Sequence, residues 1–317
     1  MNFLVPMIQE EQANNSQDAL EHLKGYALSS IDETTLYYHL SKPTSPKATI
    51  VLCDGVGCHG YIWKKLIPLL VNEFNVLCWH YRGHGESGIP IDRGRISISD
   101  HALDFASIVK MLDRNMASSS GSTFVVGHSM GVQVALEIMR LMPDAIEGLI
   151  LACGTYGKPI SQSPTLSFFK SYLPTIQKTV DFAPRFFNLL NKQLLQQKFA
   201  YTIATLVEIN PNYISEDDFR PYLEGMSNMD IPLFLKMLEE LDVHDASDLL
   251  EDIEIPTLVI SGDSDGFTTT DASKALAEGI KDSVFENIKE GSHTTPLERP
   301  DLFNPMVLDF ISQHLGN

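Results

Sequence analysis

Basic side chains and cysteines are both scarce in this 317-residue chain. Lysine and arginine together number 23 against 41 aspartates and glutamates, so the formal net charge is −18. Such a charge repels phosphate backbones and anionic membrane surfaces, which argues against a nucleic-acid-binding protein. The cysteines include no C-x-x-C pair, so we expect neither a zinc site nor a redox dithiol. The four cysteines are Cys53, Cys58, Cys78 and Cys153.

Long apolar runs are also missing. No stretch approaches the roughly 18 apolar residues that a membrane span needs. The N-terminal sequence MNFLVPMIQEEQ has no positive segment, and its apolar stretch is too short for a secretory signal. We therefore expect a cytoplasmic protein that does not insert into membranes and is a monomer or a homodimer. With 44% hydrophobic residues, the chain can build one large domain that carries an insertion.

Apolar, β-branched runs alternate with helical patterns along much of the chain. A run that is apolar throughout is typical of a strand covered on both faces. Alternation of such strands with amphipathic helices predicts a doubly wound α/β fold with a mostly parallel sheet. The expected strands lie at 48–54, 74–81, 123–127, 146–153, 255–263 and 283–288, with two more within 26–40. The expected helices lie at 61–71, 98–113, 132–142, 271–280 and 300–315.

The alternation is interrupted between residues 158 and 246. This segment has no convincing strand, and its pattern indicates several amphipathic helices separated by prolines. We expect a helical cap at 158–246, inserted into a core of residues 23–157 and 247–317, with an N-terminal arm at 1–22. Most of its many aromatic and aliphatic side chains are expected to pack the cap helices against each other and against the core. Some are expected to line an apolar pocket.

The pentapeptide G-H-S-M-G at 127–131 carries the first chemical signal. It follows an expected strand and precedes an expected helix, which is the setting of a nucleophile elbow. Gly127 and Gly131 allow backbones to approach closely on both sides of a strained turn. The turn raises the hydroxyl of Ser129 and directs the backbone N–H of Met130 at the same point. The alternative is a plain strand-to-helix turn without a chemical role.

A serine nucleophile needs a base, and the base needs an orienting carboxylate. The expected strand at 255–263 ends in G-D-S-D-G, which offers Asp263 and Asp265. Farther along, His293 follows the strand expected at 283–288 in a glycine-containing loop. Functional loops of α/β sheets gather at the carboxyl ends of the strands. We therefore expect His293 and one of the two aspartates to serve Ser129.

Together these motifs resemble the α/β-hydrolase superfamily, in its serine-nucleophile branch with a helical cap. The resemblance implies an eight-stranded sheet and a reaction without a metal or organic cofactor. In the family the acid usually stands three residues after the strand-ending glycine, here Gly262, which favours Asp265. Epoxide hydrolases and haloalkane dehalogenases of this fold carry an aspartate nucleophile, so Ser129 implies acyl transfer instead. The matching pieces are R-G-H-G-E-S at 82–87, G-H-S-M-G at 127–131, P-T-L-V-I-S-G-D-S-D at 256–265 and G-S-H at 291–293, with E-R-P just downstream at 298–300.

The loop after the strand at 48–54 departs from the family pattern. Most members have His-Gly there, whereas this chain has C-D-G-V-G, with Asp54 in the place of the histidine. By the resemblance, the N–H of Val56 would join that of Met130 in an oxyanion hole, because main-chain donors do not depend on the side chain at position 54. Asp54 either lies near the developing negative charge, which is unfavourable, or points away and hydrogen-bonds the loop.

These residues predict a carboxylesterase-like hydrolase. Ser129, His293 and Asp265 would cleave an ester or related acyl compound, with a medium-sized, apolar small molecule as the substrate. Carbon–carbon bond hydrolysis, perhydrolysis and acyl transfer to an alcohol use the same three residues and stay open. A ligand receptor with little turnover is the alternative from another class of protein.

Overall fold

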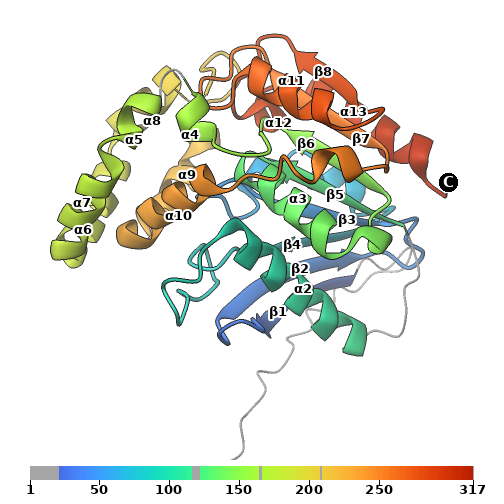
Figure 1. Ribbon diagram of the computed structural model, residues 1–317, viewed down its shortest axis with the longest axis horizontal. Helices are drawn as coiled ribbons and strands as arrows, with labels where there is room; N and C mark the ends of the chain where they lie inside the picture. Colours follow the sequence, from blue (N-terminus) through green and yellow to red (C-terminus); the bar gives the residue numbers. More distant parts are fainter. Residues whose placement is uncertain (1–20, 116–121, 164–165, 208, 317) are drawn as a thin grey trace, which may run out of the picture.

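Eight strands form one sheet in the computed structural model, which describes residues 21–115, 122–163, 166–207 and 209–316. The strand order is β1-β2-β4-β3-β5-β6-β7-β8 (Figure 1). All neighbours from β4 to β8 are parallel, whereas β2 pairs antiparallel with both β1 and β4. The predicted α/β fold with a mostly parallel, eight-stranded sheet is therefore confirmed. The strands are β1 (Glu21–Leu28), β2 (Thr35–Lys42), β3 (Thr49–Cys53), β4 (Asn75–Trp79), β5 (Thr123–His128), β6 (Gly148–Ala152), β7 (Thr257–Gly262) and β8 (Val284–Ile288).

The two faces of the sheet bury separate apolar clusters. On β3, Val51 and Cys53 point into one cluster, and Ile50 and Leu52 point into the other. This double burial explains why apolar residues on the central strands point to both faces rather than to one. The first cluster is covered by α2 (Ile98–Asn115), α3 (Met130–Leu141) and α11 (Thr270–Gly279). The second is covered by α1 (Ile67–Leu70) and α13 (Pro300–His314), with α12 (Thr295–Glu298) preceding α13.

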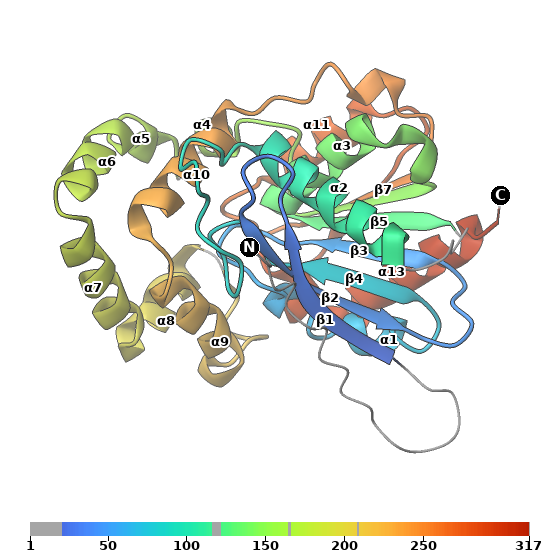
Figure 2. The ribbon, with the colours of Figure 1, turned by 90° about the horizontal axis from the view of Figure 1, so that it is seen from below.

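Among the described residues, seven α-helices lie between β6 and β7 in the sequence, and they gather at one side of the molecule (Figures 1 and 2). The chain leaves and re-enters the core at one place, where Gly157 and Asp245 form an antiparallel bridge. Prolines stand in the first turn of α6, α7 and α10, where their missing N–H costs no helical hydrogen bond. The helices are α4 (Pro159–Gln162), α5 (Ser167–Lys170), α6 (Leu173–Phe182), α7 (Pro184–Leu195), α8 (Lys198–Val207), α9 (Glu216–Ser227) and α10 (Ile231–Val243).

Two segments differ from the sequence expectations or lie beyond them. The arm expected at 1–22 falls outside the described residues, except that Glu21 and His22 begin β1. The helix expected at 61–71 is shorter than predicted: a 3₁₀ turn covers Tyr61–Trp63 and α1 begins only at Ile67. Three consecutive side chains at 61–63 are buried, which an amphipathic helix with one apolar face does not achieve. Across the described residues, no helix combines the length and the apolar character that crossing a bilayer requires.

Candidate active site

Ser129 stands at the tip of the turn between β5 and α3. Its backbone has φ 56° and ψ −120°, a conformation that residues with a side chain rarely adopt. Two glycines make this turn possible. A Cβ on Gly131 would collide with the carbonyl oxygen of Cys53, and one on Gly127 would collide with the carbonyl oxygen of Gly131. The strained backbone therefore presents the serine at the carboxyl end of β5, as a nucleophile elbow does.

Ser129, His293 and Asp265 form one chain of hydrogen bonds. Ser129 Oγ lies 2.8 Å from Nε2 of His293, and Nδ1 of His293 lies 2.9 Å from Oδ2 of Asp265. Because the carboxylate can only accept, Nδ1 carries the ring proton and Nε2 accepts from the hydroxyl of Ser129. His293 and Asp265 are buried, whereas Ser129 is half-buried and reachable by a ligand. The arrangement can act as nucleophile, base and orienting acid.

The neighbouring carboxylate of Asp263 lies outside this chain of hydrogen bonds. It is exposed and accepts the backbone N–H of Glu290 at 2.8 Å. Asp265, in contrast, accepts the N–H groups of Phe267 and Thr268, both at 2.8 Å. These two bonds fix the orientation of the Asp265 carboxylate toward the histidine ring. Of the two aspartates that end the strand, the structure brings only Asp265 to His293.

Glu298 holds the loop that carries His293, a role that the sequence pattern did not predict. Its buried carboxylate accepts the N–H and hydroxyl of Ser292, at 2.7 and 2.6 Å, and the hydroxyl of Thr294 at 3.0 Å. It also accepts the N–H of Asn210, beyond α8, at 2.6 Å. Glu298 begins the E-R-P piece at 298–300 that belongs to the family resemblance, but that match assigned no role to the glutamate. The loop of His293 and the segment between α8 and α9 are thereby tied to one carboxylate.

His128 and Phe267 enclose the imidazole of His293. His128 Nε2 donates to the backbone carbonyl of His293 at 2.7 Å, and the two ring centroids lie 5.1 Å apart. Burial, assisted by the charge of His293, lowers the pKa of His128 to about 3. His128 therefore stays neutral at ordinary pH. The ring of Phe267 packs 4.9 Å from that of His293, so both neighbours restrict the base without adding charge.

Val56 and Met130, the residues expected to supply the oxyanion N–H groups, both line the cavity beside Ser129. Within the described residues, the N–H groups of these two residues have no hydrogen-bond partner. The next N–H along the loop, that of Gly57, donates to Nε2 of His84 at 2.9 Å. The R-G-H-G-E-S loop, to which His84 belongs, therefore supports the loop of Val56 from behind.

Asp54 does not line the cavity and instead bonds across its own loop. Its Oδ2 accepts the N–H of Gly60 at 2.5 Å, and its carbonyl oxygen accepts the hydroxyl of Tyr81 at 3.0 Å. Of the two orientations that the sequence left open, the structure shows the one that hydrogen-bonds the loop. Burial raises the pKa of Asp54 to about 7, although the Gly60 N–H opposes this rise.

Asp54 is expected to make the protein less stable as the pH rises. Its pKa is about 7 in the folded protein and near 3.8 in the unfolded chain. Between these two pH values the folded state holds a proton that the unfolded state has released. The contribution of Asp54 to the free energy of unfolding is therefore complete below about pH 4 and lost above about pH 7. The free energy of unfolding should therefore fall by roughly 2–3 kcal/mol more between pH 5 and pH 8 in the wild type than in Asp54→Asn. Urea unfolding of both proteins measures this difference, and parallel pH curves would contradict the prediction.

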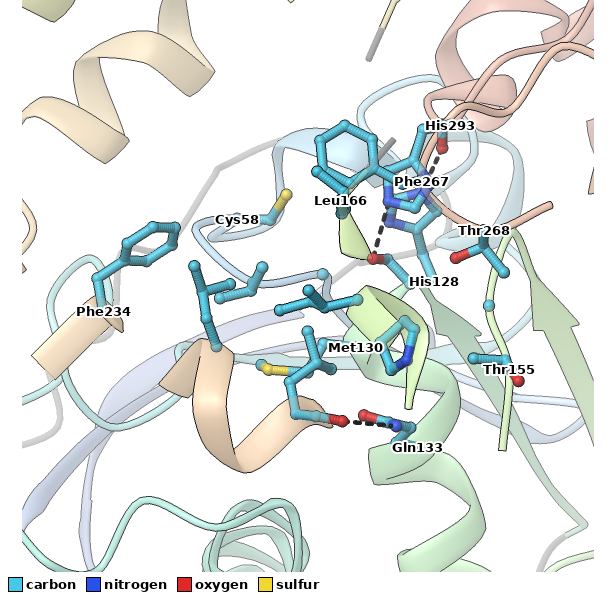
Figure 3. A pocket seen from close by; sticks show the side chains of 18 of the residues that line it. Cys58, His128, Met130, Gln133, Thr155, Leu166, Phe234, Phe267, Thr268 and His293 are labelled. Carbon is cyan, nitrogen blue, oxygen red and sulfur yellow. Dashed lines mark hydrogen bonds between the residues drawn. The ribbon is translucent and has the colours of Figure 1, made fainter. Parts of the chain in front are cut away.

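Ser129 opens into a cavity of about 380 Å³ between the core and the inserted helices (Figure 3). Apart from His128 and His293, the described residues that line it include no ionisable side chain other than Cys58 and Tyr222. Gln133 Nε2 donates to the carbonyl oxygen of Leu241 at 3.1 Å and so joins α3 to α10. The inserted helices and their connections contribute mostly apolar side chains, including Ile160, Leu166, Phe169, Leu173, Ile176 and Phe234. In the described part of the chain, His, Cys, Asp and Glu do not form any group of three that could hold a metal ion.

Known proteins match this chain over most of its length. "Putative carbamate hydrolase RutD" of Azorhizobium caulinodans is 25% identical over 293 residues, which cover 89% of this chain and 96% of that protein. "Uncharacterized hydrolase YugF" of Bacillus subtilis is 24% identical over 287 residues, with shares of 89% and 96%. A solved structure of a thermophilic esterase from Thermogutta terrifontis has a TM-score of 0.70 at 21% identity and covers 92% of this chain and 99% of that one. The structural likeness confirms the fold.

One family model spans both the sheet and the candidate site. It is described as "Serine aminopeptidase, S33" and matches residues 44–300. This span contains Ser129, Asp265 and His293, together with β3 to β8. With the sheet order and the relatives in agreement, the chain is a hydrolase of the α/β-hydrolase superfamily and belongs to the serine aminopeptidase S33 family.

Proposed function

We propose that the protein hydrolyses carboxylic esters with an apolar acyl group of medium size, through an acyl-enzyme on Ser129. The observation that carries this proposal is the hydrogen-bonded chain of Ser129, His293 and Asp265 at the wall of an apolar cavity. A volume of about 380 Å³ suits a small molecule rather than a polymer. The apolar lining favours an acyl chain over a sugar or a highly charged group.

The first half of the proposed reaction forms the acyl-enzyme. Ser129 Oγ attacks the ester carbonyl carbon while its proton passes to Nε2 of His293. The carbonyl electrons move to the oxygen, which accepts the N–H groups of Val56 and Met130. Asp265 accepts the hydrogen bond from the Nδ1 proton, which stays on the ring, and stabilises the positive charge of the imidazolium. The bond to the alcohol oxygen then breaks, and the alcohol leaves with the proton from Nε2.

The second half releases the acid. A water molecule gives a proton to His293 and attacks the acyl carbon, and the same two N–H groups hold the new oxyanion. When this intermediate collapses, the bond to Ser129 Oγ breaks and the serine recovers its proton. One ester and one water thus yield one alcohol and one carboxylic acid. These steps require only groups of the chain and the water.

Carbamate hydrolysis is the second candidate. Several matched relatives carry the name "Putative carbamate hydrolase RutD", and a carbamate carbonyl can follow the same steps. A small carbamate would leave most of the cavity empty, and the lining offers it no lysine or arginine. We therefore place ester hydrolysis first.

Turnover and covalent labelling test the proposal together. The substrates are p-nitrophenyl esters of increasing chain length, a lactone and a p-nitrophenyl carbamate. We expect many turnovers per protein, with kcat/KM highest at an intermediate chain length, and one adduct by intact mass after a small fluorophosphonate. Folded protein that gives no adduct and no turnover would contradict the proposal. One slow turnover without cycling would instead indicate a ligand receptor.

A further inference from the structure

The corner between α6 and α7 exposes a cluster of large apolar side chains. Phe182, which ends α6, is 91% exposed, and Phe186 and Leu189 on α7 are 61% and 57% exposed. Both helices lie on the side of the molecule opposite α13, at the rim of the inserted helices (Figures 1 and 2). We call Phe182, Phe186 and Leu189, with the cations beside them, the α6–α7 corner. A monomer that stays in water rarely exposes such a cluster without a function.

Hydrogen bonds fix the rotation of α7 in the orientation that exposes Phe186 and Leu189. Asn188 Oδ1 accepts the N–H of Ile231 at 2.8 Å, and Asn191 Nδ2 donates to the carbonyl oxygen of Met226 at 2.9 Å. The two asparagines thus point toward α9 and α10. A helix on a protein in water usually turns its polar side outward, whereas α7 exposes Phe186 and Leu189 as well as its two cations. Rotating the helix to bury Phe186 would break both bonds.

The same corner is basic in a strongly acidic chain. Residues 166–197 contain four cations and one acid, a net charge of +3, whereas the whole chain carries −18. Lys170 pairs with Asp242 at 3.0 Å. The other three cations, Lys178, Arg185 and Lys192, are exposed and have no ion-pair partner among the residues that the structure describes. Aromatic side chains surrounded by cations are typical of helices that bind anionic lipid surfaces.

Charge also indicates whether this corner binds a lipid surface or a second copy of the chain. Two corners that meet around a twofold axis would place the three unpaired cations opposite three more. An anionic bilayer instead attracts each of them by about 1 kcal/mol. Carboxylates elsewhere on the protein act weakly on the surface once they lie beyond about 8–10 Å, because salt screens them. The repulsion that the net charge of the chain predicts between the protein and an anionic membrane is therefore weak at this corner.

We propose that the α6–α7 corner docks the protein on an anionic lipid bilayer. Phe182 and Phe186 enter the headgroup region, while Lys178, Arg185 and Lys192 contact anionic headgroups. The inserted depth is that of single side chains, so the protein lies on the membrane and does not span it. Docking is independent of the proposed reaction. It places the cavity near the surface, because Leu173 and Ile176 of α6 line that cavity.

Flotation of the full-length protein with large unilamellar vesicles tests the docking. The vesicles are phosphatidylcholine alone, or phosphatidylcholine with phosphatidylglycerol. We expect binding to the anionic vesicles that falls about tenfold in Phe182→Ser/Phe186→Ser. It should fall similarly in Lys178→Gln/Arg185→Gln/Lys192→Gln and with added salt. The control is Ile91→Ser/Val243→Ser, which replaces apolar side chains that are 70% and 73% exposed but lie outside the corner. It should bind like the wild type.

Several results would overturn the proposal. The first is that the wild type does not bind anionic vesicles. The second is that Phe182→Ser/Phe186→Ser binds them as well as the wild type does. The third result comes from sedimentation velocity. If the wild type is a dimer that the phenylalanine variant turns into a monomer, the corner is an interface between copies. All the replaced side chains are exposed, so the far-UV circular dichroism and the unfolding midpoint should not change. Fluorophosphonate labelling should also persist in each variant, which separates this test from that of the reaction.

Discussion

Ser129→Ala is expected to lower kcat for the best ester by about 10⁴–10⁶-fold, with little change in the unfolding midpoint. The hydroxyl is the group of the protein that the proposed reaction joins to the acyl carbon, and it lies 2.8 Å from its base. Alanine leaves the Val56 and Met130 N–H groups and the cavity in place. Residual turnover should therefore reflect binding and oxyanion stabilisation alone. Steady-state kinetics at saturating ester measure the loss.

The matched control for this variant is Ser264→Ala. Ser264 is an exposed serine one residue before Asp265, and its hydroxyl donates to Asp263. Its replacement should leave kcat within about twofold of the wild type, since surface changes away from the reacting atoms have small effects. The fluorophosphonate adduct should disappear in Ser129→Ala and remain in Ser264→Ala. If Ser129→Ala keeps more than a few per cent of wild-type kcat, another residue is the nucleophile.

The sequence predicted the parts of the site that depend on local backbone geometry. A nucleophile elbow needs glycines at fixed positions around the serine, and the collisions that a Cβ would cause at 127 and 131 explain why the pentapeptide is informative. The order of strands along the chain was also predictable, because double burial makes the strands apolar throughout. His293 could be placed because it follows the last strand, at the edge where the functional loops gather.

Contacts between distant segments were not predictable in the same way. Glu298 tethers the histidine loop through donors at 210, 292 and 294, and the E-R-P match at 298–300 does not identify these partners. The direction of Asp54 depends on Gly60, whose N–H turns toward it only in the folded loop. The segment 61–71 has helical spacing, yet the core buries three consecutive side chains there. On α7, apolar residues suggested packing, whereas Asn188 and Asn191 set the rotation of the helix.

Asp265→Asn is the second large effect that we expect, a loss of about 10³–10⁴-fold in kcat with KM nearly unchanged. The asparagine oxygen can still accept the N–H groups of Phe267 and Thr268, so the loop should keep its shape. Its amide would then turn two donors toward Nδ1 of His293. The ring would carry its proton on Nε2, where it can no longer accept the proton of Ser129. The kinetics should therefore show a defect in the chemical steps rather than in substrate binding.

Asp263→Asn is the decisive comparison, because both carboxylates follow the same strand and stand two residues apart. Asp263 is exposed and accepts the N–H of Glu290, so its replacement should change kcat by no more than about twofold. The reverse ranking, with Asp263→Asn the more damaging, would mean that the working enzyme recruits Asp263 to His293. Equal and small losses in both variants would mean that His293 needs no carboxylate. Only a large loss confined to Asp265→Asn fits a base that is held by its bond to Asp265, 2.9 Å long in the structure.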